Sequence, residues 1–96
     1  MHNFDTLPTK KGDVLVSSAY AAGTTMVDFS NVHRPNEVGH LDPEGANTWS
    51  SYWYNGHIFT NYGGRGVDII KVRDRASSGA RKLPYSNPQT QISLMR

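Results

Sequence analysis

An internal similarity limits what this chain can fold into more than any other feature of the sequence. Shifting the sequence by 43 positions aligns VLVSSAYAAGTTMVDF with HIFTNYGGRGVDIIKV without a gap. Only Gly23 and Gly66 are identical, so the similarity lies in the pattern of an apolar run, a short turn and a second apolar run. A period of about 40 to 45 residues with several short strands in each unit is typical of a β-propeller blade. The pattern therefore predicts two successive units of the same β-structure.

The aromatic stretch NTWSSYWYNGHIFTNY begins the second unit. It turns at Asn55-Gly56, a step that suits the positive φ angles of a type I′ hairpin turn. Strict alternation along the strand puts Trp49 and Trp53 on one face of the sheet and Tyr52 on the other. Aromatic side chains on both faces are expected where neighbours cover a sheet on both sides. We therefore expect packing between blades, with an exposed ligand platform as the alternative.

Turn residues divide the remaining chain into short strands. Of the 96 residues 36% are hydrophobic, and there are 9 glycines and 5 prolines, which favours β-structure with many turns. After a polar opening, the expected strands are 13–20, 23–29, 37–42, the aromatic stretch up to its Asn-Gly turn, 57–62 and 67–72. Residues 1–72 thus form two units, about 1–42 and 43–72, and residues 73–96 form a basic C-terminal tail or strap.

The formal net charge of +2 is unevenly distributed along the chain. Residues 1–70 hold four basic and seven acidic side chains, a net charge of −3, whereas residues 71–96 hold six basic and one acidic, a net charge of +5. A basic tail can bind nucleic acid. Because its basic residues are dispersed and Tyr85 is its only aromatic residue, the tail lacks a base-stacking platform, and we expect no nucleic-acid partner.

Several classes of protein are excluded by what the sequence lacks. There is no cysteine, so disulfides and thiolate metal sites are excluded. No apolar run approaches the roughly 20 residues that cross a bilayer, and the first residues lack the apolar run of a signal peptide. We expect no membrane association.

Five segments resemble a known family. HNF, AGTTMVDFSN, PNEVGHLDPEG, NTWSSYWYNGHIFTNYGGRGVDIIKV and LPYSNPQTQ together are similar to the C-terminal part of the LVIVD-repeat proteins, a family of bacterial β-propellers. The resemblance runs from about His2 to Gln91. Its most specific piece is WSSYWYNGHIF, followed by an Arg-Gly-Val-Asp step. The resemblance implies the last two blades of a propeller, an extracellular or periplasmic location and no assigned enzymatic activity; relatives are generally longer and commonly begin with an export signal.

No motif in the sequence demands a catalytic or metal centre. The four histidines have no metal-ligand spacing, no serine lies in a G-x-S-x-G elbow, and no spacing of carboxylates requires a catalytic pair. We therefore assign no catalytic residue, no metal ligand and no cofactor. A hydrolase-like or metal-dependent enzyme is therefore only the second alternative to the main functional hypothesis given below.

Ligand binding at the rim or in the channel of an assembled propeller is the first alternative to the main functional hypothesis. Turns that join blade strands lie at the rims, where ligands bind. A small polar or anionic ligand at this rim or in the channel would contact six candidate residues. These are Arg65, Asn61, Asp68, Tyr62, Tyr52 and Trp49.

The sequence as a whole predicts an all-β chain of two β-propeller-like blades of antiparallel strands. Two blades cannot close a ring, and a lone pair leaves apolar sheet faces in water. We therefore expect the propeller to be completed by oligomerisation, with copies of the chain or other blades of a larger propeller as partners. The first functional hypothesis is a non-enzymatic structural or binding module that self-assembles through its aromatic sheet faces.

Overall fold

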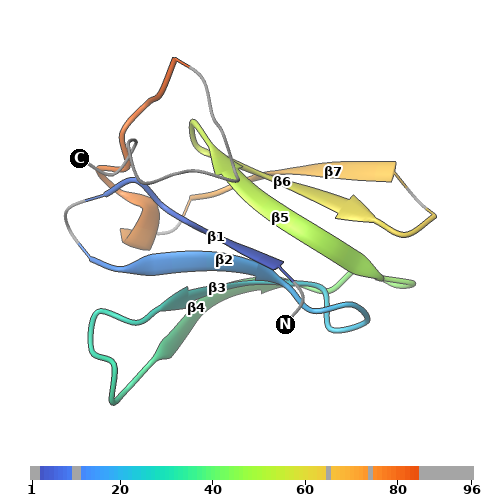
Figure 1. Ribbon diagram of the computed structural model, residues 1–96, viewed down its shortest axis with the longest axis horizontal. Helices are drawn as coiled ribbons and strands as arrows, with labels where there is room; N and C mark the ends of the chain where they lie inside the picture. Colours follow the sequence, from blue (N-terminus) through green and yellow to red (C-terminus); the bar gives the residue numbers. More distant parts are fainter. Residues whose placement is uncertain (1–2, 10–11, 65, 74, 85–96) are drawn as a thin grey trace.

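The computed structural model describes residues 3–9, 12–64, 66–73 and 75–84, which form two antiparallel sheets (Figure 1). The first sheet has the order β1-β2-β3-β4 and the second the order β5-β6-β7. The all-β prediction is confirmed. The bounds are β1 Asn3–Thr6, β2 Val14–Ser18, β3 Thr24–Asp28, β4 Asn36–Leu41, β5 Thr48–Tyr54, β6 His57–Tyr62 and β7 Gly66–Lys71, followed by a short 3-10 turn, η1 Arg75–Ser77.

Strand β1 was not expected, because the opening residues read as polar. It pairs antiparallel with β2, with Phe4 opposite Ser17 and Asp5 opposite Val16. Phe4 is the only apolar residue of this strand, so the sequence shows no alternating pattern. Pairing with β2, rather than a local preference, defines the strand.

The predicted Asn-Gly hairpin is present between β5 and β6. Asn55 has a φ of 49° and Gly56 a φ of 91°, so both central residues adopt the left-handed region that this turn requires. The turn brings Tyr54 opposite His57. The short-range sequence signal was sufficient here because the turn geometry depends on these two residues alone.

Strict alternation is wrong at the start of the aromatic strand. The pairing of β5 with β6 shifts between Thr48 and Ser50, so Trp49 is the extra residue of a β-bulge. Trp53 is buried at 4% exposure, whereas Trp49 is 50% exposed and packs edge-on against Tyr20. The two tryptophans therefore have different surroundings.

The strand register reproduces the 43-residue shift. Leu15 pairs with Val27 in the first sheet, and Ile58 pairs with Ile70 in the second. Each of the other β2–β3 pairs likewise has a β6–β7 counterpart 43 residues later. Strand β1 corresponds to β5 with a shift of 47, since both pair with the first strand of the similar hairpin. Among the described residues of the second sheet, no strand corresponds to β4.

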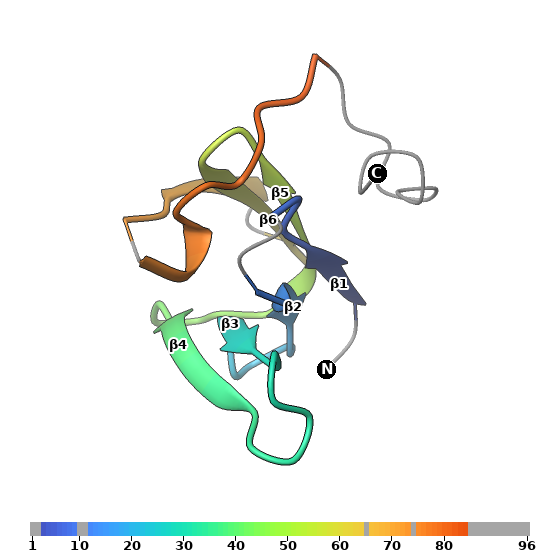
Figure 2. The same ribbon diagram turned by 90° about the vertical axis from the view of Figure 1, so that its left-hand side faces the viewer.

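The two sheets share one apolar core. They approach most closely where β1 and β2 contact β5, and they separate toward β4 and β7 (Figures 1 and 2). We call the two facing surfaces the inner faces and the opposite surfaces the outer faces. The core consists of Leu7, Val14, Val16, Met26, Trp53 and Ile58, with the half-buried Val38, Ile70, Val72 and Ala80 packed against it.

A buried carboxylate joins the edges of the two sheets. Asp5 is 3% exposed, and its Oδ2 accepts a hydrogen bond from the Trp53 backbone N–H at 2.7 Å. Its Oδ1 accepts one from the Thr6 N–H at 2.8 Å. Since β5 is an edge strand, the Trp53 N–H has no neighbouring strand to bond, and the Asp5 side-chain oxygen satisfies it. Nearby, Tyr20 and Thr48 exchange two backbone hydrogen bonds of 3.1 and 3.0 Å.

The described part of the predicted tail crosses the end of both sheets (Figure 1). The Arg81 N–H donates to the Pro8 carbonyl, in the loop after β1, at 2.9 Å. Leu83 exchanges two hydrogen bonds with the Asn55 side chain, of 2.8 and 3.0 Å, and its carbonyl also accepts from the Tyr54 hydroxyl. Residues 75–84 thus form a strap on their own chain; the remainder of the predicted tail, 85–96, lies outside the described residues.

The substitution Asn55→Gly measures the contribution of this strap. Glycine tolerates the φ of 49° at this position, so the change keeps the turn and removes both side-chain hydrogen bonds to Leu83. We expect the free energy of unfolding, measured by urea titration, to fall by about 1–3 kcal/mol.

A chain that ends at Lys82 is the control for this substitution, because it lacks Leu83 in any case. In that background Asn55→Gly should lower the free energy of unfolding by less than about 0.5 kcal/mol. An equal loss in both backgrounds would show that Asn55 acts on the turn and not on the strap.

Candidate functional site

Two of the six predicted rim residues meet on the inner face of the second sheet. The Tyr62 hydroxyl donates a hydrogen bond to Asp68 Oδ2 at 2.9 Å, and Tyr62 is only 7% exposed. The hydrogen bond joins β6 to β7 within the second sheet, on the face that is directed toward the first sheet. Arg65, the residue expected to bind an anion there, lies outside the described residues.

The other three described candidates lie elsewhere. Asn61 is on the outer face, where its Oδ1 accepts hydrogen bonds from the Ser50 N–H and hydroxyl, both at 2.9 Å. The Tyr52 hydroxyl, from the same outer face, accepts one from the Asn3 amide at 3.2 Å. Trp49 lies at the bulge. The five described candidates are therefore divided among an inner face, an outer face and a strand end, because alternation sends sequence neighbours to opposite sides.

Four buried hydroxyls bridge the two sheets. Ser51 Oγ lies 2.6 Å from Ser18 Oγ, 2.8 Å from Thr60 Oγ1 and 3.3 Å from Thr24 Oγ1. Thr24 and Thr60 are in turn 3.1 Å apart, and none of the four residues is more than 3% exposed. A hydroxyl both donates and accepts, so the four satisfy one another. No histidine or carboxylate is a partner in these bonds, so the cluster supplies inter-sheet cohesion rather than a nucleophile.

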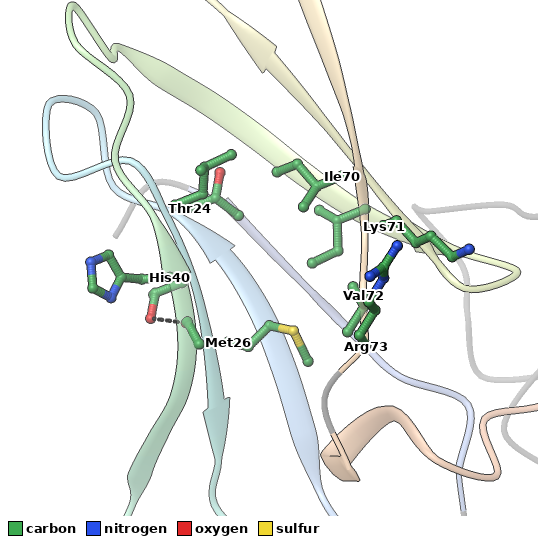
Figure 3. A pocket seen from close by; sticks show the side chains of 11 residues that line it. Thr24, Met26, His40, Ile70, Lys71, Val72 and Arg73 are labelled. Carbon is green, nitrogen blue, oxygen red and sulfur yellow. Dashed lines mark hydrogen bonds between the residues drawn. The ribbon is translucent and has the colours of Figure 1, made fainter.

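An apolar groove of about 170 Å³ opens where the two sheets diverge, between β3 and β4 on one side and β7 on the other (Figure 3). Met26 and Ile70 point into it from opposite walls, whereas the Lys71 side chain extends away. Its volume is close to that of an engineered apolar cavity of about 150 Å³ that binds benzene. The residues that line it are Thr24, Thr25, Met26, Gly39, His40, Leu41, Ile58, Ile70, Lys71, Val72 and Arg73, and they include no carboxylate.

The outer face of the second sheet is the most unusual surface of the described chain. Cross-strand pairing aligns Tyr52, Phe59 and Ile69 in one row and places Val67 beside Asn61 in the next. Val67 is 61% exposed and Ile69 is 64% exposed. These two exposed side chains lie beside the half-buried Tyr52 and Phe59, which makes this face apolar.

The outer face of the first sheet is also apolar. Leu15 and Val27 are paired on it, both half-buried, and Phe4 beside Ser17 is 56% exposed. Tyr52 was expected on an aromatic face from the sequence, whereas Phe4, Val67 and Ile69 were not expected on an apolar surface. The period-2 pattern of VDIIKV carried the signal for the last two, since it leaves Val67 and Ile69 on one side.

The shifted pKa of Asp28 and the contact between His40 and Glu37 both lie in or near the segment from the end of β3 to the end of β4. Hydrogen bonds from the Ser30 hydroxyl, at 2.6 Å, and from the Ser30 N–H lower the pKa of Asp28 below its ordinary value. His40 Nδ1 lies 3.3 Å from Glu37 Oε1. Within the described ranges, no three His, Cys, Asp or Glu side chains cluster as a metal site would need, and no helix has the length and apolarity of a membrane span.

Replacing Ser51 tests the structural role of the hydroxyl cluster. Ser51→Ala removes the hydroxyl that contacts the other three and leaves them with fewer partners in a buried position. We expect the free energy of unfolding to fall by about 1–3 kcal/mol in urea titration. Ser78→Ala, at an exposed turn residue, should change it by less than about 0.5 kcal/mol. Equal values for the two variants would contradict a cohesive role.

Comparisons of the chain with protein-family models, with curated proteins and with solved structures found no significant match. The geometry of the described residues is therefore the basis for a functional assignment. Its main feature is a pair of apolar outer faces.

Proposed function

We propose that this chain is a non-enzymatic structural module, a pair of propeller-like blades that self-associates through its outer sheet faces. The observation that carries the proposal is the exposure of Val67 and Ile69. Their counterparts 43 residues earlier, Thr24 and Met26, are 3% and 5% exposed because the second sheet covers them. The second sheet presents the same kind of surface with nothing described above it.

The topology supports the blade interpretation. Each sheet is an antiparallel meander in which neighbours in sequence are neighbours in space. The first strands of the two sheets lie close together, and the later strands diverge (Figure 2). Radial blades have this arrangement, since their first strands surround an axis. The resemblance to the LVIVD-repeat family agrees with it and suggests an extracellular or periplasmic location.

The energetics favour an assembly in which both outer faces are used. Full burial of one large apolar side chain contributes about 1.5–3 kcal/mol. Val67, Ile69 and Phe4 are the most exposed residues of the two outer faces, at 61%, 64% and 56%. Because each is already partly buried in the single chain, the three would together contribute about 3–5 kcal/mol at one interface. Association costs about 4–15 kcal/mol in lost freedom, so one such interface is marginal. In a closed ring each chain takes part in two interfaces, whereas in a dimer joined by one such interface each chain takes part in only one. A closed ring of copies is therefore favoured over an isolated dimer.

The variant Ile69→Lys tests this proposal. The wild-type chain should sediment at an integer multiple of the chain mass, independent of concentration over a wide range. Ile69 is 64% exposed in the single chain, so lysine there should leave the fold intact. In an interface the unpaired charge should weaken association by about 3 kcal/mol, more than a hundredfold. The expected product is a folded monomer.

Val32→Lys is the matched control, because Val32 is 71% exposed and lies in the turn between β3 and β4, away from both sheet faces. It should keep the wild-type mass. A monomeric wild-type chain, or an Ile69→Lys assembly of unchanged mass, would contradict the proposal. If the chain associates only with other blades of a larger propeller, the isolated wild-type chain should be a monomer.

A further inference from the structure

We infer that copies of this chain associate head to tail, with the outer face of the second sheet on the outer face of the first sheet of the next copy. The contact would repeat, between chains, the contact that the two sheets already make within one chain. This inference rests on the proposed self-association and adds to it the two surfaces, their polarity and their register.

The inner face of the first sheet carries Val16 and Met26. Val16 and Met26 form a cross-strand pair, and both are buried in the core at 0% and 5% exposure. Their counterparts 43 residues later are Phe59 and Ile69, which also form a cross-strand pair. That second pair lies on the outer face. The inner face of the first sheet therefore corresponds to the outer face of the second.

The converse holds for the other two faces. Ile58 and Ile70 pair on the inner face of the second sheet, where Ile58 is 3% exposed. Their counterparts, Leu15 and Val27, pair on the outer face of the first sheet. The inner face of the second sheet therefore corresponds to the outer face of the first.

Within one chain, the sheets thus join two different kinds of face. A two-fold sandwich would bring equivalent faces together and leave equivalent faces outside. Here one face of each kind is buried between the sheets, and one face of each kind lies on the outside. The two outer faces therefore match each other in the same way as the two inner faces do. Contacts between different surfaces of identical copies are heterologous, and they continue until the rotation closes a ring.

The hydrogen bonds of the inner contact predict which residues meet between copies. Ser18 Oγ and Ser51 Oγ are 2.6 Å apart across the two sheets. Asn61 is the counterpart of Ser18 by the 43-residue shift, and Phe4 is the counterpart of Ser51 by the 47-residue shift. Asn61 of one copy should therefore lie next to Phe4 of the next. Both residues are exposed in the single chain.

The contact between copies is more apolar than the internal one. Thr24 contacts Thr60 across the inner faces at 3.1 Å, and the counterpart of Thr24 is Val67. Phe4 likewise takes the position of a serine.

Disulfide cross-linking tests the pairing directly, because the chain has no cysteine of its own. Chains with Phe4→Cys are mixed with mass-tagged chains that carry Asn61→Cys, the native mass of the mixture is measured, and the mixture is then oxidised. The expected product is a covalent dimer of the two different chains, formed at least about tenfold faster than either homodimer, because only head-to-tail packing brings these Cβ atoms within disulfide range.

Two controls calibrate the rates. Ser18→Cys with Ser51→Cys in one chain should close an internal disulfide, which shows that the template distance is productive. Val32→Cys, mixed with Asn61→Cys, gives the rate for an exposed thiol outside the faces. Ser17→Cys with Val67→Cys is a second intermolecular pair that keeps the Phe4 ring, because these residues are the counterparts of Thr60 and Thr24, which lie 3.1 Å apart across the inner faces.

The outcomes separate the two proposals. A monomeric wild-type chain overturns self-association and this inference with it. An oligomer in which Asn61→Cys homodimers form as fast as mixed dimers has like faces in contact, which overturns the inference and leaves self-association intact. An oligomer in which both mixed pairs react no faster than the Val32→Cys control uses another surface, with the same consequence.

Discussion

The packing of Val16 and Met26 against Ile58 and Ile70 is the contact on which the rest of this structure depends. A single three- or four-stranded sheet has no core of its own, and each sheet here buries one apolar face only by lying on the other. The remaining links serve this contact. Asp5 joins the sheet edges, four hydroxyls set the distance between the sheets, and Leu83 ties the strap to Asn55.

The same contact explains why one chain leaves so much apolar surface exposed. The inner face of the first sheet corresponds to the outer face of the second. The two sheets are therefore stacked in the same orientation one after the other, and they are not related by a two-fold axis as in a symmetric sandwich. A second copy can extend this stack without new surface chemistry. The four hydroxyls lie at the internal contact between the two sheets.

Predictions from the sequence were correct where short-range rules decide the structure. The Asn55-Gly56 turn and the two similar hairpins follow from positive-φ chemistry and period-2 alternation. They were wrong or absent where a distant partner decides. Strand β1 needs β2 as its neighbour, and the bulge that exposes Trp49 arises from pairing with β6. The groove near Met26 exists because two sheets diverge, and no local pattern encodes that.

The sequence alone determined the all-β class, the main turns and the 43-residue spacing, because these depend on residues close together in the chain. It also determined that Val67 and Ile69 share one side of a strand. Tertiary structure decided which side of each sheet is covered, since burial depends on residues of the other sheet, which lie far away in the sequence. It also dispersed the candidate rim residues over separate faces and turned the repeated pattern into a pair of unlike, unmatched surfaces.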